Sequence, residues 1–112
     1  MYEFVLFLTI RLFPSKFSNH TVQYSNWKEG KGDVVREFVD SCRKLGSMPS
    51  FYLSPWDRFF YNMTWKPEYN EYYYNTMNEL TSNYGPIYEL WWDGANAQPH
   101  MTHVIICIIH HI

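Results

Sequence analysis

Three apolar segments that alternate with two segments of helical periodicity constrain the fold of this chain more than any other feature. The apolar segments, residues 4–12, 50–55 and 87–92, have the length and composition of buried strands. Strands that alternate with helices of this length are typical of parallel sheets joined by right-handed crossovers. The sequence therefore predicts an α/β fold, a βαβαβ unit with parallel strands. Three strands cannot close a barrel, so we expect the unit to be a slice of something larger.

The first helical segment has both of its ends marked. Asp33 is a natural N-cap, and Gly46 stands where a glycine commonly ends a helix. Apolar residues recur between them at helical spacing and predict one buried face: Val35, Phe38, Val39, Cys42 and Leu45. Cys42 is therefore interpreted as a buried free thiol.

The second helical segment is expected to begin near Pro67, because proline suits the first turn of a helix. Gly85 and Pro86 are expected to stop it. The residues that recur on one of its faces are mostly aromatic: Tyr69, Tyr72, Tyr73, Thr76, Leu80 and Tyr84.

Composition and charge narrow the classes of partner. Hydrophobic residues make up 46% of the 112 residues and charged residues 18%, which excludes a disordered chain. A net charge of −2 without a basic run predicts no nucleic-acid partner. The apolar N-terminal stretch is too short to span a bilayer and lacks the features of a signal peptide, so we expect no membrane partner. The two cysteines have no metal-ligand spacing, and we expect neither a metal nor a cofactor.

Acidic residues follow the second and third predicted strands. Asp57 and Asp93 stand at the carboxyl ends of these strands, where ligands gather in parallel α/β sheets. The alternation of side chains along the last strand places Glu89, Trp91 and Asp93 on one side. Each acid also has a structural interpretation. Asp93 with its glycine forms an ordinary turn, Asp57 pairs with Arg58, and Glu89 is a paired carboxylate.

Three blocks of sequence, residues 12–46, 50–58 and 68–95, resemble the α-L-fucosidases of glycoside hydrolase family twenty-nine. They include the run Tyr-Leu-Ser-Pro-Trp-Asp-Arg and the strand-end motif Trp-Asp-Gly, in the order and with the gaps of that family. The resemblance covers residues 8–97. It implies that residues 1–97 are part of a (β/α)8 catalytic barrel, a TIM barrel, and that residues 98–112 are an unmatched aliphatic tail.

The resemblance also implies an activity. Members of the family hydrolyse α-L-fucosyl linkages with retention of configuration, and the Asp of the strand-end motif, here Asp93, is the nucleophile. The implied substrate is a fucosylated oligosaccharide or glycoprotein, and the family is typically secreted or lysosomal. Trp56, Trp92 and Phe13 become candidate substrate-binding residues.

The chain departs from the family in two places that matter for activity. The segment His-His-Asp-Gly-Phe, whose histidines hold the fucose hydroxyls in the family, is absent between Thr9 and Leu12, and Phe13 replaces a tryptophan. No acid/base residue is assigned, because Asp57, Glu68 and Glu71 match no acid/base motif. We therefore expect the chain to be incomplete and inactive alone.

Two alternatives stay open. The chain is a non-catalytic carbohydrate-binding or interaction fragment that uses its aromatic edge, or it is a truncated gene product without function. An open three-stranded sheet also predicts aggregation or a molten state. The sequence indicates neither the oligomeric state nor the compartment.

Overall fold

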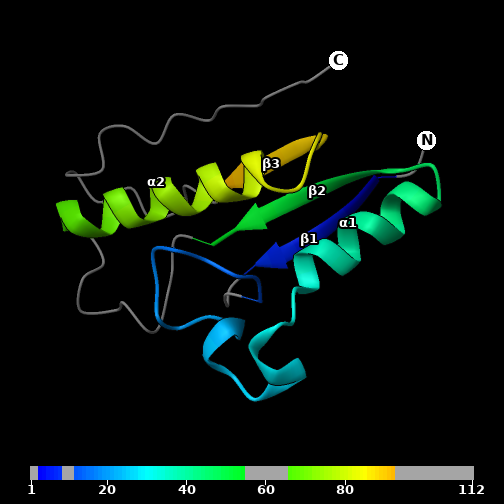
Figure 1. Ribbon diagram of the computed structural model, residues 1–112. Helices are drawn as coiled ribbons and strands as arrows, with labels where there is room; N and C mark the ends of the chain where they lie inside the picture. The colour runs from blue at the N-terminus through cyan, green and yellow to red at the C-terminus, as the bar shows by residue number, and fades with distance from the viewer. Residues whose placement is uncertain (1–2, 9–11, 55–65, 93–112) are drawn as a thin grey trace.

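The computed structural model describes residues 3–8, 12–54 and 66–92, and within them the predicted alternation of strands and helices is confirmed (Figure 1). Two short 3₁₀ helices precede the first α-helix. In chain order the elements are β1 (Glu3–Leu8), η1 (Val22–Tyr24), η2 (Trp27–Gly30), α1 (Val34–Lys44), β2 (Met48–Leu53), α2 (Pro67–Ser82) and β3 (Glu89–Trp92).

The three strands are parallel, as predicted, and they form one sheet in the order β1-β2-β3. Leu6 pairs with Phe51, which in turn pairs with Leu90, so one row of apolar side chains crosses the sheet. The third strand is shorter than expected, since β3 begins at Glu89. The backbone N–H of Tyr88, one residue earlier, donates to the carbonyl of Pro49 at 2.9 Å.

Helix α1 begins and ends where the sequence predicts. Asp33 is the N-cap, and its side chain accepts a hydrogen bond of 2.9 Å from the backbone N–H of Arg36. Cys42 is a buried free cysteine, as expected. The prediction that Leu45 belongs to the buried face is wrong, because its side chain is 72% exposed. Leu45 is the C-cap, after which the chain turns through Gly46 at φ +71°, so it no longer follows the periodicity of the helix.

Helix α2 has Pro67 in its first turn, as predicted, and ends at Ser82. Its buried residues are Tyr69, Thr76, Met77, Glu79 and Leu80. Tyr84 is also buried, but it lies beyond the end of the helix, in the turn that leads to β3.

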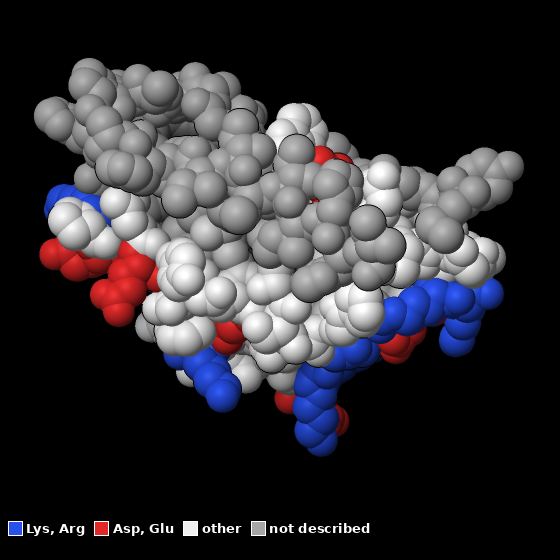
Figure 2. Space-filling view, turned by 90° about the horizontal axis from the view of Figure 1, so that it is seen from above, with Lys and Arg blue, Asp and Glu red and all other residues white. Residues whose placement is uncertain are grey.

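The hydrophobic core lies between the sheet and the two helices, which occupy the same side of it (Figure 1). It joins residues of all these elements to others from the connecting segments: Phe13, Val35, Val39, Phe51, Leu53, Met77, Leu80, Tyr84, Ile87 and Leu90. On the surface visible in Figure 2, the described acidic and basic side chains are interspersed among uncharged residues. The helices that the structure describes include none long and apolar enough to cross a membrane.

Candidate functional site

The carboxyl edge of the sheet is the candidate site, because the last two strands end there together. Leu53, the final residue of β2, pairs with Trp92, the final residue of β3. Asp93 follows Trp92 in the sequence. The predicted site residues Asp93 and Trp56, like Asp57, lie outside the described residues. For Trp92, the structure describes only the backbone, as the last residue of β3.

The sheet presents two different faces near this edge. Leu90 is 5% exposed and packs in the core on the helix side. Trp91, its neighbour, points to the opposite face and is 52% exposed. Its ring lies edge-on to that of Tyr52 on β2, with centroids 5.2 Å apart. This face, opposite the helices, is called the open face below.

Trp91 was not among the residues singled out as substrate-binding, although a signal for it was present. The alternation of side chains along a strand predicts that Leu90 and Trp91 lie on opposite faces of the sheet. The burial of Leu90 and the exposure of Trp91 agree with that alternation. An exposed aromatic ring beside the strand end is a surface on which a ligand can stack.

Helix α2 holds the end of β2. The hydroxyl of Tyr73 donates a hydrogen bond of 2.6 Å to the carbonyl of Leu53. The ring of Tyr73 stacks on that of Tyr69, with centroids 6.2 Å apart, and Tyr69 is 2% exposed. A buried ring therefore orients the phenol that satisfies the last carbonyl of the strand, and this fixes the edge of the site.

Phe13 lies in the hydrophobic core. It is 1% exposed, and its ring meets that of Tyr84 edge-on at 6.4 Å. Its contacts in this structure are therefore packing contacts. A substrate-binding role for Phe13 stays a prediction.

A buried carboxylate anchors the segment that follows Phe13. Glu79 is 8% exposed and accepts hydrogen bonds from the hydroxyl of Ser15 at 2.6 Å and from the backbone N–H of Lys16 at 2.9 Å. Burying a carboxylate is costly unless it is hydrogen-bonded, and here each oxygen has a donor. The sequence contained a signal for this role, since Glu79 stands three residues after Thr76 on the buried face of the helix.

Polar and aromatic contacts bind α1 to the turn before β3. They join Asp33, Arg36 and Arg43, at the helix, to Tyr84 in the turn. The hydroxyl of Tyr84 donates to Oδ2 of Asp33 at 2.9 Å, and the guanidinium of Arg36 lies 4.6 Å from the centre of the Tyr84 ring. Arg43 donates to the carbonyls of Tyr84 at 2.5 Å and Pro86 at 3.2 Å. Burial, and to a lesser extent the charge of Asp33, raises the pKa of Tyr84 above its ordinary value.

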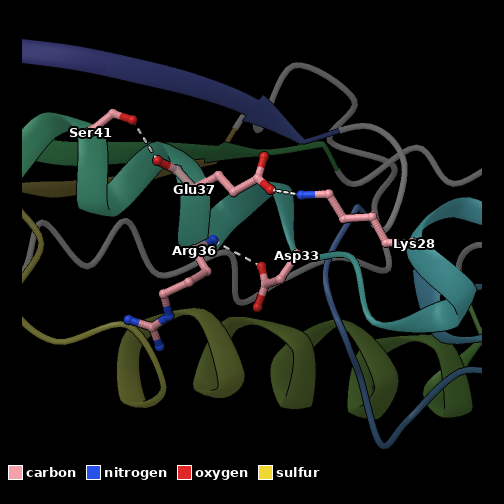
Figure 3. A network of polar contacts seen from close by, with 5 residues as sticks. All are labelled: Lys28, Asp33, Arg36, Glu37 and Ser41. Carbon is pink, nitrogen blue, oxygen red and sulfur yellow. Dashed lines mark hydrogen bonds and ion pairs between the residues drawn. The ribbon is translucent and has the colours of Figure 1, made fainter.

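The other side of α1 is bound to η2. Figure 3 shows the Lys28 ammonium paired with the Glu37 carboxylate, and the Ser41 hydroxyl donating to the Glu37 carbonyl. In the same view Asp33 caps the helix through the backbone N–H of Arg36. The Lys28–Glu37 pair is exposed, so it contributes little to stability. Across residues 3–8, 12–54 and 66–92, no three potential ligands of a metal ion gather in one place.

Comparison with known proteins identifies the family. The family Alpha-L-fucosidase matches residues 9–108, a range that runs past the boundary at residue 97 suggested by the motifs. Alpha-L-fucosidase 1 of Arabidopsis thaliana is 43% identical over 86 residues, which are 77% of this chain and 17% of that protein. The crystal structure of a glycoside hydrolase 29 family member from an unknown rumen bacterium superposes with a TM-score of 0.71 at 42% identity, over 84% of this chain and 17% of the other. This chain thus spans about a sixth of the length of these relatives, and it belongs to the α-L-fucosidase family.

Proposed function

We propose that this chain is the part of a retaining α-L-fucosidase barrel that bears the nucleophile, Asp93. The observation that carries the proposal is the paired ending of β2 and β3 at Leu53 and Trp92, directly before Asp93. A rigid strand end holds a carboxylate with the precision that attack on an anomeric carbon needs. In this assignment residues 1–97 belong to the (β/α)8 barrel.

The proposed chemistry has two displacements. A carboxylate oxygen of Asp93 bonds to the anomeric carbon of an α-L-fucosyl group while the bond to the leaving oxygen breaks and that oxygen takes a proton from a second carboxyl group. Water then cleaves the glycosyl ester, and the second group accepts the proton of the water. Retaining enzymes place the two carboxyl groups about 5–5.5 Å apart. The proposal takes only Asp93 from this chain.

Aromatic side chains would bind the substrate, a fucosylated oligosaccharide or glycoprotein. Trp56 and Trp92 are proposed from the resemblance, and the structure supports adding Trp91. The Trp91 ring is half exposed on the open face and is oriented by its contact with Tyr52. Aromatic rings suit this role because they offer a large apolar surface that loses little conformational entropy on binding. Phe13 is also proposed from the resemblance, although its ring packs in the hydrophobic core.

We expect no turnover from the chain by itself. The acid/base residue is not assigned, and the histidine pair that holds fucose hydroxyls in the family has no counterpart between Thr9 and Leu12. Losing a general acid alone typically lowers a rate by ~10²–10⁴-fold. An unactivated aryl α-L-fucoside, whose leaving group needs a proton, should therefore stay intact.

The decisive experiment tests the nucleophile with a substrate that does not need the general acid. The purified chain is incubated at millimolar concentration with 2-deoxy-2-fluoro-α-L-fucosyl fluoride, whose leaving group departs without protonation. We expect a slow mass increase of one fluorofucosyl group, mapped by peptide sequencing to Asp93 and absent from Asp93→Asn. Labelling at another residue, or none in the folded chain, would contradict the assignment. Release of phenol from an aryl fucoside above the Asp93→Asn background would contradict the absence of turnover.

Sugar binding without chemistry is the second candidate, and the exposed Trp91 ring, which contacts Tyr52, favours it. Titration with L-fucose distinguishes the two. Binding that Trp56→Ala weakens, in a chain that the fluorofucoside does not label, would support the second candidate over the first.

A further inference from the structure

We propose that Asn19 is the acceptor of an N-linked glycan and that the exposed ring of Phe17 packs against the first sugar of this glycan. Residues 17–21 read Phe-Ser-Asn-His-Thr. An asparagine followed two positions later by threonine, with a residue other than proline between them, is the acceptor sequence for N-glycosylation. The inference goes beyond the proposed function, because it concerns a modification of this chain and not the sugar that the chain would hydrolyse.

Asn19 is exposed in the loop that joins β1 to α1. This loop is anchored to the core both before and after Asn19. Before it, the buried carboxylate of Glu79 accepts hydrogen bonds from Ser15 and Lys16. After it, Val22 is 6% exposed. A glycan on Asn19 would therefore extend into solvent from a fixed point and displace no part of the core.

The ring of Phe17 is close enough to reach a sugar on Asn19. The two residues are two positions apart, so their Cα atoms are separated by at most ~7 Å, a distance that aromatic side chains bridge. The backbone N–H of Phe17 donates to the Ser15 hydroxyl at 3.2 Å, and that of His20 donates to the Ser18 hydroxyl at 3.0 Å. These local bonds hold the backbone in turns on either side of the position, so the folded chain fixes the spacing between ring and amide.

The chemistry of the first sugar suits this ring. N-linked glycans begin with N-acetylglucosamine, whose pyranose has an apolar face of C–H groups. Phe17 is 44% exposed, so contact with that face removes apolar surface of both groups from water. The contact forms only when the loop is folded, and it should therefore stabilise the folded chain.

The transfer needs one co-reactant, an oligosaccharide carried on a polyprenyl diphosphate. The amide nitrogen Nδ2 of Asn19 bonds to the anomeric carbon of the sugar while the bond from that carbon to the diphosphate oxygen breaks. The diphosphate leaves with the electron pair, and the amide nitrogen releases one proton to a base of the transferase. No oxidation or reduction is involved.

Thr21 indicates when the transfer takes place. The acceptor sequence requires a hydroxyl at this position. In the folded chain Thr21 is 8% exposed, and its hydroxyl accepts a hydrogen bond of 3.4 Å from the backbone N–H of Gln23 at the start of η1. A transferase cannot reach a hydroxyl that is buried in this way, so we expect transfer during synthesis of the chain, before the loop folds.

Synthesis of the chain behind a signal peptide, in the presence of endoplasmic-reticulum microsomes, tests the acceptor. A second acceptor sequence begins at Asn62, outside the described residues, so every protein in the experiment carries Asn62→Gln. We expect a glycosylated product, from which peptide N-glycosidase F releases the glycan and converts Asn19 to aspartate. Thr21→Ser should keep the modification, whereas Thr21→Ala and Asn19→Gln should lose it.

Two outcomes of this experiment would overturn the proposal. One is an unmodified chain in the Asn62→Gln background, and the other is a modification that survives Asn19→Gln. Modification of the purified, folded chain by permeabilised microsomes, at the rate seen during synthesis, would contradict the order of transfer and folding.

The contact with Phe17 is tested on the modified chain after endoglycosidase H has trimmed the glycan to one N-acetylglucosamine. We expect this sugar to raise the midpoint of thermal unfolding by several degrees relative to Asn19→Gln. The rise should disappear in Phe17→Ala and persist in Tyr24→Ala, a control at a ring in the same loop that is 71% exposed. Both rings are partly in solvent, so neither substitution opens the core. A rise that persists in Phe17→Ala, or no rise when Phe17 is present, would refute the contact.

Discussion

The hydroxyl of Tyr84 donates a hydrogen bond of 2.9 Å to Oδ2 of Asp33, while Oδ1 of the same carboxylate caps α1 through the backbone N–H of Arg36. One side chain therefore begins the first helix and also holds the turn that leads into β3. The two residues are 51 positions apart, so the contact closes a long segment of chain. The strand that precedes Asp93 is thereby anchored to a helix that lies outside the candidate site.

Removing the Tyr84 hydroxyl should lower stability without altering the shape of the core. Tyr84→Phe leaves one oxygen of a partly buried carboxylate without its donor, and hydrogen bonds to charged groups contribute about 1.5–3 kcal/mol. We expect the free energy of unfolding in urea to fall by roughly that amount. Tyr74→Phe, at a side chain that is 60% exposed, is the control and should change stability by less than about 0.5 kcal/mol. A loss for Tyr84→Phe no larger than the control would contradict this account.

The same residue should make the chain sensitive to alkali. Burial raises the folded-state pKa of Tyr84 above its ordinary value near 10. The unfolded chain then releases the proton first, so the contribution of this group is complete below pH 10 and is lost as the pH rises further. The free energy of unfolding between pH 8 and pH 11 should therefore fall more steeply for the unaltered chain than for Tyr84→Phe. Parallel curves would show that Tyr84 does not control the alkaline limit.

The Glu79 carboxylate should contribute more to the stability of the folded chain than the exposed acids of the same helix. Glu79→Ala leaves the Ser15 hydroxyl and the Lys16 N–H without their acceptor, at a cost of about 2–4 kcal/mol for the two groups. Glu79→Gln keeps one acceptor oxygen and should lose less. Glu71→Ala, on the exposed side of α2, is the control for helix propensity. Thermal unfolding of the three variants ranks the losses, and equal losses for Glu79→Ala and Glu71→Ala would exclude the anchoring role.

Alanine substitutions at two glycines with positive φ distinguish the cost of a left-handed backbone from the cost of a steric clash. A methyl group on Gly46 at φ +71° meets nothing within 4 Å, whereas one on Gly85 at φ +75° would lie 2.8 Å from Nη2 of Arg43. Gly46→Ala should cost about 1 kcal/mol for the left-handed backbone alone. Gly85→Ala should cost about 1–2 kcal/mol more, because Arg43 loses its hydrogen bonds to the carbonyls of Tyr84 and Pro86. In an Arg43→Ala background this excess should disappear from the urea unfolding curves, and its persistence would point to another cause.

The order of elements, the parallel sheet and both ends of α1 could be predicted because each depends on local chemistry. A capping aspartate, a terminal glycine and the spacing of apolar residues act over a few positions. The exposure of Leu45 could not be predicted from spacing, because the periodicity continues one residue past the point where the helix stops. The hydrogen-bond donors of Glu79 could not be predicted from local spacing, because they lie 63 and 64 positions away.

The candidate site was predictable only in outline. Adjacent parallel strands end at one edge, so the location of the site follows from the fold class. Alternation also predicts that Trp91 lies on the face opposite the buried Leu90. The nucleophile was predicted from the resemblance to the family, and its assignment to Asp93 stays a prediction.

The hydrogen bond from the Tyr88 N–H to the Pro49 carbonyl limits which insertions and deletions this chain tolerates. It fixes the register of β3 against β2 before the strand begins. Because side chains alternate along a strand, the insertion or deletion of one residue between positions 88 and 92 would exchange the faces of Leu90 and Trp91. The aromatic ring would then enter the core and the leucine would face outward. Natural variants of this strand should therefore differ by substitution, or by changes of two residues at a time.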